Sequence, residues 1–283
     1  MPPHTDPSHP RTYRGRLAPS PTGYLHLGHA RTFWTAQTRA QQHHGTLILR
    51  NDDLDASRSR PHFVAAMLED LAWFGFQWHE GPDRGGPFAP YSQSERLPQY
   101  QAAFHRLQQQ EAVYPCSCSR HDVLRALAAP HAGDDDPVYP GICRPPHSPK
   151  ATGTRINWRF RVPDRTPIEF HDVACGPQRF VAGVDFGDFI VWRHDGLPAY
   201  HLACVVDDAL MRVTEVVRGA DLLRSTARQL LLYQALAWQA PAFCHCPLLT
   251  DERGVRLAKR HDALSLRTLR TQGATPDSLR SRW

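Results

Sequence analysis

The chain has 283 residues, of which 41% are hydrophobic and 10% aromatic. This composition is ordinary for a globular protein and excludes global disorder, and no apolar run approaches the roughly 20 residues of a membrane helix. The formal net charge of +5 suits a polyanionic partner, although many enzymes that never contact nucleic acid share it. Residues 1–12 contain no apolar signal core, so we expect a disordered N-terminal tail and a cytoplasmic protein.

The first part of the chain predicts a parallel βαβ unit followed by helices. Strand and helix patterns occur, in chain order, over 13–19 (strand), 28–43 (helix), 46–50 (strand), 61–75 (helix) and 97–111 (helix). Strand, helix and strand within about 40 residues are typical of a parallel crossover. Pro61 suits a first helical position and Gly75 suits a helix end.

The second part begins with a change of character. Residues 116–150 are rich in proline and acidic residues and have no period, so we expect an irregular excursion there. Regular patterns then resume over 154–162, 178–184 and 188–193 (strands), 200–219 (helix or turn, then strand) and 225–238 (helix). The sequence has no internal repeats.

Two histidines, His26 and His29, flank Gly28 where the first predicted strand turns into the first helix. A helix N-terminus offers unpaired backbone donors and the positive end of the helix dipole, and glycine lets a ligand approach the backbone. Two imidazole donors at this position can hold a triphosphate and stabilise the charge that builds on a phosphorus under attack. This is the chemistry of nucleotidyl transfer. Taken alone, the tetrapeptide is better explained by two exposed capping histidines.

Seven cysteines, an odd number without an export signal, favour free thiols or a metal site. Three of them, Cys116, Cys118 and Cys143, lie in the irregular excursion, where a zinc ion can organise a segment that has few core residues. Their spacing is not that of a generic zinc finger. Cys244 and Cys246 form a competing candidate, but they lie in a strand-like run, where buried small residues are the preferred interpretation.

The run "RLAPSPTGYLHLGHAR", residues 16–31, resembles the first signature of class I aminoacyl-tRNA synthetases of the glutamate type. The resemblance covers about residues 13–269, in the family's order, through the segments 47–61, 71–82, 91–100, 200–223 and 256–263. It implies an α/β fold, with a Rossmann-like parallel sheet as the class I catalytic core and an inserted zinc-binding or acceptor-type subdomain. The implied domains are a tail (1–12), the first half of the catalytic domain (13–112), the inserted subdomain (113–190) and the second catalytic half (191–283).

The run "RLAKR", residues 256–260, is similar to the family's mobile KMSKS-type loop. The resemblance implies that Lys259 binds ATP phosphates in the transition state. Arg256 replaces the usual first lysine and keeps its charge, whereas Ala258 replaces a serine and loses a hydroxyl. A solvated basic loop is the alternative. The implied catalytic residues are His26, His29 and Lys259, and the implied ATP-binding residues are His26, Gly28, His29 and Lys259.

Glutamate-activating relatives bind their amino acid through residues that match five positions here. The resemblance therefore implies a glutamate site formed by Arg16, Ser20, Asp52, Tyr200 and Arg218. Asp52 departs from the family's usual glutamate. Its side chain is one methylene shorter, so we expect the contact with the substrate ammonium to lengthen or to run through water. Asp53 and Asp55 nearby are explained equally by structural caps.

The short paralogues in this family, the glutamyl-queuosine tRNA(Asp) synthetases, hold a zinc ion through three cysteines and a tyrosine at the spacing seen here. The resemblance therefore implies one structural Zn²⁺ bound by Cys116, Cys118, Tyr139 and Cys143.

The C-terminal end also resembles these paralogues. About a dozen residues follow Arg270, whereas a full glutamyl-tRNA synthetase continues into an anticodon-reading domain. The resemblance implies tRNA-independent activation of glutamate by ATP, with Mg²⁺ on the leaving pyrophosphate, and transfer of glutamate to queuosine in the anticodon of tRNA(Asp). The expected partners are glutamate, ATP and queuosine-bearing tRNA(Asp), with no membrane, and we expect a monomer. The alternatives are a truncated synthetase charging tRNA(Glu), a non-catalytic tRNA- or nucleotide-binding paralogue, and a metal-dependent regulator built around the cysteines.

Overall fold

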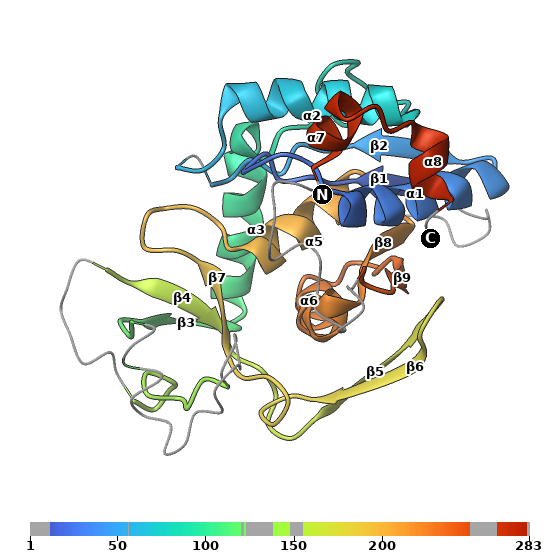
Figure 1. Ribbon diagram of the computed structural model, residues 1–283. Helices are drawn as coiled ribbons and strands as arrows, with labels where there is room; N and C mark the ends of the chain where they lie inside the picture. The colour runs from blue at the N-terminus through green and yellow to red at the C-terminus, as the bar shows by residue number, and fades with distance from the viewer. Residues whose placement is uncertain are drawn as a thin grey trace. The chain divides into compact units, whose positions relative to one another are not determined.

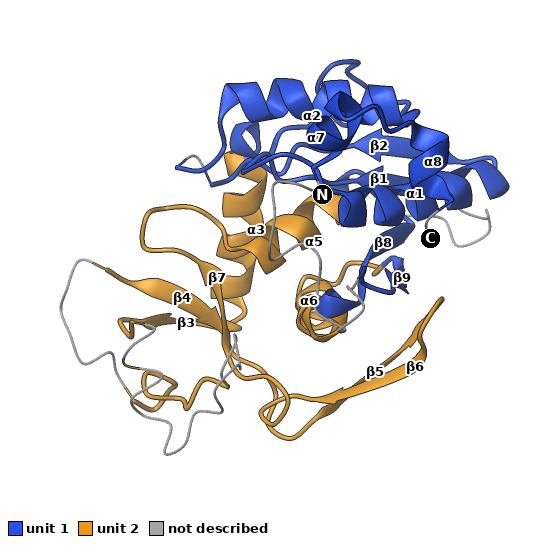
Figure 2. Ribbon diagram, in the orientation of Figure 1, with its two compact units in different colours: residues 1–96, 210–222, 241–283 blue, residues 97–209, 223–240 orange. Residues whose placement is uncertain are grey.

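A computed structural model describes residues 12–55, 57–119, 122, 138–147, 155–249 and 265–281 (Figure 1). The chain forms two compact units (Figure 2). Unit 1 comprises Met1–Arg96, Leu210–Leu222 and Pro241–Trp283, and unit 2 comprises Leu97–Ala209 and Leu223–Ala240. The boundaries of these two units differ from those of the four expected domains. The expected domain boundaries stay a prediction. The expected N-terminal tail lies outside the described residues except for Thr12.

Unit 1 contains the predicted βαβ crossover, which is confirmed. Strand β1 (Arg14–Leu17), helix α1 (Leu27–Gln42) and strand β2 (Thr46–Leu49) follow one another in the chain. The two strands pair in parallel, with Arg16 opposite Ile48. Three of the four residues in each strand are buried, which explains the apolar sequence TLIL of β2, whereas β1, RGRL, buries an arginine, Arg16.

The next helix, α2 (Pro61–Phe74), begins and ends where the sequence predicts. Pro61 lies in its first turn, and Gly75 ends it in the left-handed conformation with φ of 91°. A short 3₁₀ helix, η1 (Gln93–Glu95), follows. Helix α2 contributes Met67, Leu71 and Phe74 to the hydrophobic core of unit 1.

Two further strands, β8 (Glu215–Gly219) and β9 (Ala242–Cys246), form a second parallel pair in unit 1. The backbone N–H of Thr214, just before β8, donates to the carbonyl of Arg14 over 2.9 Å, which joins the start of β8 to β1. Cys244 and Cys246 pack into the core of this unit, so the interpretation of these thiols as buried small residues is confirmed.

A partly buried charge network ties α1 to β8. The Arg39 guanidinium on α1 forms a two-pronged ion pair with the Glu215 carboxylate, and the hydroxyl of Tyr13 donates to the same carboxylate over 2.8 Å. Burial, together with the Glu215 charge, raises the pKa of Tyr13 above its usual range, so its hydroxyl keeps its proton. The network fixes the helix that carries the two histidines against the strand that carries Arg218.

Unit 1 ends with two short helices that sequence patterns did not indicate. They are α7 (Leu266–Thr271) and α8 (Pro276–Arg280), and a 3₁₀ turn, η2 (Ala220–Leu222), follows β8. Ser265 and Thr275 cap the two helices through their side-chain oxygens. Helices of five and six residues are too short to show a clear apolar period.

Unit 2 consists of helices and antiparallel strands. Its elements are α3 (Leu97–Gln109), β3 (Val113–Cys116), β4 (Asn157–Phe160), β5 (Pro167–Asp172), β6 (Gly176–Val181), β7 (Phe189–Trp192), α5 (Tyr200–Leu210, whose last residue belongs to unit 1) and α6 (Leu223–Ala235). Strands β3, β4 and β7 lie in that order (Figure 1), and both of these pairings are antiparallel. Strands β5 and β6 form an antiparallel hairpin.

The chain is therefore an α/β protein with mixed strand pairings. The predicted parallel pairing holds for β1 with β2 and for β8 with β9, whereas the strands of the expected insertion are antiparallel. Sequence patterns missed β5, because five of its six residues are exposed or half-buried and supply little apolar signal. Within the described part of the chain, the helices are all too short or too polar to span a membrane.

Candidate active site and metal centre

The two histidines predicted to hold ATP form the N-terminal cap of α1. His26 is the N-cap residue, and its Nδ1 accepts the backbone N–H of Gly28 over 3.1 Å. The Nδ1 of His29 accepts the backbone N–H of His26 over 3.3 Å, which completes a capping box. The two rings stack with their centroids 3.6 Å apart. The two histidines are therefore caps, as the alternative interpretation of this tetrapeptide predicts, but they are half-buried and not exposed. The cap does not exclude nucleotide binding, which stays a prediction.

The capping bonds decide which ring nitrogen of each histidine can donate. Because Nδ1 accepts a backbone hydrogen in both rings, the neutral imidazole carries its proton on Nε2. Both side chains are half-buried. The result is a pair of stacked rings whose Nε2–H groups are donors, at the positive end of a 16-residue helix.

Gly28 packs closely against the first ring. A Cβ atom on this residue would lie 3.0 Å from Cε1 and 3.1 Å from Nδ1 of His26, closer than side chains usually approach. A larger residue would therefore require the His26 ring to move by a few tenths of an ångström. Gly28 therefore has a second structural role, close packing against the His26 ring, besides the predicted close approach of a ligand.

Lys259, Arg256 and Ala258 lie outside the described residues. The chain resumes at Ser265, which forms an antiparallel bridge with His26. The next residue, Leu266, donates its backbone N–H to the carbonyl of Leu25 over 2.7 Å. The segment that follows the KMSKS-like run is thus joined directly to the histidine turn.

Two of the predicted glutamate-binding residues, Arg16 and Arg218, come together through β8. Arg16 is 6% exposed, and its Nη1 donates to the backbone carbonyl of Val217 over 2.8 Å. Val217 directly precedes Arg218, which is 5% exposed. Arg218 donates from Nε to Nε2 of His245 over 3.1 Å. Each of the two buried guanidinium groups thus has a neutral hydrogen-bond partner that fixes its position, and a guanidinium fork matches the geometry of a carboxylate.

Asp52, expected to contact the substrate ammonium, forms a two-pronged ion pair with Arg50. The distances are 2.6 Å from Nε to Oδ1 and 3.1 Å from Nη2 to Oδ2. Arg50 is fully buried, whereas the Asp52 side chain is 9% exposed. The backbone N–H of Asp52 donates to the carbonyl of Pro19 over 3.0 Å, so this carboxylate lies beside the turn that carries Ser20.

The neighbouring acidic residues act as caps, as the structural interpretation predicts. Asp53 accepts both the backbone N–H (2.8 Å) and the hydroxyl (2.7 Å) of Ser94. Asp55 accepts from the Ser57 hydroxyl and from Arg58, each over 2.6 Å, and these hydrogen bonds lower its pKa to about 2.

The remaining two glutamate-site residues differ in position. Ser20 is exposed and follows the end of β1 in unit 1, next to Pro19, whose carbonyl accepts the backbone N–H of Asp52. Tyr200 is the first residue of α5 in unit 2 and is 46% exposed. The structure thus brings Arg16, Ser20, Asp52 and Arg218 into one unit, and the contact of Tyr200 with a ligand stays a prediction.

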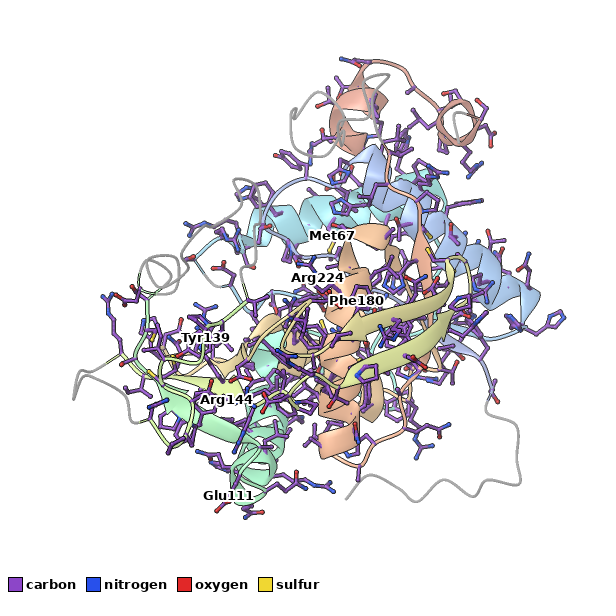
Figure 3. The ribbon with its side chains drawn as sticks, turned by 90° about the horizontal axis from the view of Figure 1, so that it is seen from below. Met67, Glu111, Tyr139, Arg144, Phe180 and Arg224 are labelled. Carbon is purple, nitrogen blue, oxygen red and sulfur yellow. The ribbon has the colours of Figure 1, made fainter. Side chains whose placement is uncertain are left out.

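The predicted metal ligands cluster in unit 2, and Figure 3 labels one of them, Tyr139. The Sγ atoms of Cys116, Cys118 and Cys143 all lie within 4.8 Å of one another, and those of Cys118 and Cys143 are 3.5 Å apart. The Tyr139 hydroxyl lies 3.4 Å from Sγ of Cys116 and 3.5 Å from that of Cys118. Sulfurs bound tetrahedrally to one zinc ion are about 3.8 Å apart, so this donor set fits zinc with small adjustments.

Protonation differs among these ligands. Burial raises the pKa of the Cys118 thiol to about 12, and it raises the pKa of the Tyr139 phenol above its usual range. At Cys143 burial acts in the same direction, but hydrogen bonds from the backbone of Ser117 and from Tyr139 outweigh it and lower the pKa. Metal binding at this cluster must therefore release protons, because zinc binds the deprotonated ligands. None of the cysteines forms a disulfide in the structure.

Three residues that contact the candidate sites escaped sequence analysis. Arg50 contacts Asp52, His245 contacts Arg218, and Arg159 donates to Sγ of Cys116 over 3.2 Å. The "CHC" run drew attention to its two cysteines, whereas its central histidine makes the polar contact. The sequence did contain a signal for this contact. Successive side chains of a strand point to opposite faces, so a strand that turns the two cysteines to one face turns the histidine between them to the other.

Three comparisons place the chain among known proteins. The family model described as tRNA synthetases class I (E and Q), catalytic domain, matches residues 12–281. The glutamyl-Q tRNA(Asp) synthetase of Symbiobacterium thermophilum is 49% identical over 271 residues, which cover 94% of this chain and 83% of that protein. Glutamate–tRNA ligase 2 of Nitrosococcus oceani is 43% identical over 93% of this chain and 57% of that protein.

Among solved structures, the glutamate-tRNA synthetase from Elizabethkingia anophelis superimposes with a TM-score of 0.79 at 31% identity. The match covers 93% of this chain and 54% of that one, so the chain spans little more than half of the ligase sequence and of this structure. The family match and the high identity over 94% of the chain lead to one conclusion. The chain belongs to the family of class I tRNA synthetases (E and Q), through their catalytic domain.

Proposed function

We propose that this protein activates glutamate with ATP, without tRNA, and transfers it to queuosine in the anticodon of tRNA(Asp). The observation that carries the proposal is the 49% identity to a glutamyl-Q tRNA(Asp) synthetase, which spans 83% of that protein. The geometry of unit 1 supports the activation step, because it joins a pair of imidazole donors and two buried guanidinium groups in one unit.

In the activation step, a carboxylate oxygen of glutamate attacks the α-phosphate of ATP, an O–P bond forms, and pyrophosphate leaves. The Nε2–H groups of His26 and His29 donate to phosphate oxygens, and the α1 N-terminus adds its dipole. Mg²⁺ bound with ATP offsets the charge of the leaving pyrophosphate. Catalysis then rests on positioning and charge stabilisation, and it needs no nucleophilic side chain.

Lys259 is proposed as the third phosphate-binding group. Six peptide units separate it from Ser265, and a fully extended chain of that length spans about 20 Å. Since Ser265 is bridged to His26, this covalent limit is compatible with a shared triphosphate. The lysine has one matched control, because Lys150 is the other lysine of the chain.

The glutamate site is proposed to consist of Arg16, Ser20, Asp52, Tyr200 and Arg218. The burial of Arg16 and Arg218 supports their role as carboxylate-binding cations, since a guanidinium fork matches a carboxylate. Asp52 supplies a negative charge for the substrate ammonium, and Arg50 holds that carboxylate from its other side.

A structural Zn²⁺ is proposed at Cys116, Cys118, Tyr139 and Cys143. The donor chemistry supports it: three sulfurs and a phenol oxygen converge in a buried cluster among few other core residues. When bound, the ion supplies cross-links that fix the described parts of the predicted excursion.

The proposed function is tested by incubating the protein with ATP, labelled glutamate, and tRNA(Asp) with or without queuosine. Label on the queuosine-bearing tRNA(Asp) alone is the expected result. Label on tRNA(Glu) would select the second candidate, a glutamate–tRNA ligase, which the 43% identity to such a ligase favours. Absence of pyrophosphate exchange with glutamate would instead select a non-catalytic tRNA- or nucleotide-binding protein.

A variant tests the nucleotide site by itself. Lys259→Ala is expected to slow glutamate-dependent pyrophosphate exchange at least a hundredfold, because the charge on the phosphates loses its cation in the transition state. Lys150→Ala should exchange at the wild-type rate. Equal rates for the two variants would remove Lys259 from the mechanism.

A further inference from the structure

Arg159, on β4, contacts two of the proposed zinc ligands at once. It is 8% exposed, and its Nε–H donates to Sγ of Cys116 over 3.2 Å. Its guanidinium carbon lies 3.8 Å from the centroid of the Tyr139 ring, a cation–π contact. A third contact, from Nη1 to the backbone carbonyl of Asp188 over 2.9 Å, fixes the plane of the guanidinium.

Strand register explains why this arginine reaches the cluster. β3 and β4 pair antiparallel, with Tyr114 opposite Arg159 and Cys116 two residues further along β3. Side chains at opposite and diagonal positions on one face of such a pair can contact each other. The placement of Arg159 beside Cys116 is therefore set by the backbone and does not depend on a metal ion.

The groups around Arg159 are also held in place. The Asp188 carboxylate accepts the Tyr114 hydroxyl over 2.5 Å and the backbone N–H of Val162 over 2.8 Å. Next to it, Gly187 permits a close backbone approach, since a Cβ there would lie 2.6 Å from the backbone nitrogen of Tyr139. The arginine and the aromatic ligand are thus packed against the same short segment.

A zinc ion bound by three thiolates has a net negative charge, and a phenolate ligand makes it more negative. Burying such a complex is costly unless a cation accompanies it and hydrogen bonds reach the ligand atoms. Arg159 supplies both, because its charge faces the cluster and one of its N–H groups bonds to a ligand sulfur. Groups that hydrogen-bond to ligands commonly change metal affinity 10- to 100-fold.

We propose that Arg159 is the charge-compensating, positioning residue of the zinc site. It orients Cys116 and Tyr139 before the metal binds and offsets the negative charge of the complex afterwards. This inference rests on the zinc site proposed above. It is distinct from a purely structural role, in which Arg159 would stabilise the metal-free and the zinc-bound protein equally.

The test compares Arg159→Gln, Arg159→Lys and Arg161→Gln in the full chain. Arg161 is an exposed arginine directly after β4 and serves as the matched control. Zinc stoichiometry and affinity are measured by competition with a chromogenic chelator, and the Co²⁺-substituted proteins are compared by their thiolate-to-metal absorption. Thermal unfolding of each protein is followed with and without zinc.

We expect one zinc per chain in the wild type and in Arg161→Gln, with equal affinities. Arg159→Gln should bind zinc at least tenfold more weakly, and zinc should raise its unfolding temperature less than it raises that of the wild type. Arg159→Lys, which keeps the charge but not the planar fork, should fall between the two. If Arg159→Gln does not fold, an affinity for Arg159→Lys below that of Arg161→Gln still supports the proposal.

Two results would overturn it, and they differ in what they imply. Wild-type affinity and Co²⁺ absorption in both Arg159 variants would remove Arg159 from the zinc site while leaving that site in place. A wild-type chain that binds no zinc would overturn the metal site as well. Neither result bears on glutamate activation, which pyrophosphate exchange measures separately.

Discussion

Arg218 on β8 and His245 on β9 lie opposite each other in the parallel register of these strands, and the Arg218 Nε–H donates to His245 Nε2 over 3.1 Å. The histidine is fully buried and the arginine nearly so. As acceptor, Nε2 of His245 is unprotonated, so the neutral ring carries its proton on Nδ1. Because the two residues are opposite each other on paired strands, the hydrogen bond fixes the orientation of the guanidinium relative to the strand backbone. The guanidinium then determines the position of any carboxylate that Arg218 binds.

His245→Ala is therefore expected to raise the KM for glutamate about tenfold in pyrophosphate exchange, because a hydrogen bond to a charged group contributes about 1.5 kcal/mol or more. The value of kcat should change less than about threefold. His245→Gln, which keeps an acceptor, should recover part of the loss. His171→Ala, an exposed histidine on β5, serves as control. An unchanged KM in a folded His245→Ala protein would show that Arg218 needs no support from β9.

Gly28→Ala is expected to lower the kcat/KM for ATP at least tenfold. A Cβ at this position would lie 3.0 Å from the His26 ring, so the ring must shift by a few tenths of an ångström, which changes the direction of its Nε2–H bond. Weakening of the cap should reduce the free energy of unfolding by up to about 1 kcal/mol, a change that thermal unfolding can follow. Gly23→Ala, in the same turn, meets no atom within 4 Å and should behave as wild type. Equal kinetics for the two variants would contradict this role of Gly28.

Asp52→Asn should weaken both the fold and the affinity for glutamate. Arg50 is fully buried, and removing the charge of its two-pronged partner leaves a buried cation less compensated, at a cost of about 3 kcal/mol in unfolding free energy. Chemical denaturation measures this loss, and isothermal titration with glutamate measures the affinity. Asp52→Glu keeps the charge and should retain most of the stability. Asp55→Asn, at a solvated cap, should change neither quantity appreciably. Full stability of Asp52→Asn would mean that Arg50 does not depend on this carboxylate.

Asp70, on α2, predicts a pH dependence of stability. It is fully buried, and neither carboxylate oxygen has a hydrogen-bond partner within the described residues. Burial raises its pKa above the usual value, against the opposing charges of Arg270 and Arg267. Since the folded-state pKa exceeds the unfolded one, the native protein binds more protons between the two values. The contribution of Asp70 to stability is therefore full below its unfolded pKa and is lost as the pH rises through the folded pKa.

Asp70→Leu is accordingly expected to be more stable than the wild type at pH 7, by about 1–3 kcal/mol, the cost of an unpaired buried polar group. The difference should shrink as the pH approaches 4. Urea denaturation at several pH values checks this, with Glu69→Gln, its exposed neighbour, as control. A difference that stays constant with pH would show that ionisation of Asp70 is not its cause.

Sequence alone determined the features whose partners lie close together in the chain. The βαβ crossover, the Pro61 start and Gly75 end of α2, and the histidine cap of α1 all depend on interactions across a few residues. A local pattern is sufficient for these, because backbone propensity and capping act over one or two helical turns. The resemblance to the short paralogues also predicted that the three excursion cysteines converge, and their sulfurs do lie within 4.8 Å of one another.

Tertiary structure decided which side chains support those residues. Arg218 and His245 are 27 positions apart, Arg159 and Cys116 are 43 apart, and Arg16 and Val217 are 201 apart. These contacts depend on strand register and on the neighbour that each strand takes in the fold, and a shift by one residue would turn every side chain to the opposite face. The register cannot be read from a single sequence, because many strand pairings would bury the same apolar residues. Only the packing of the whole fold selects one of these pairings.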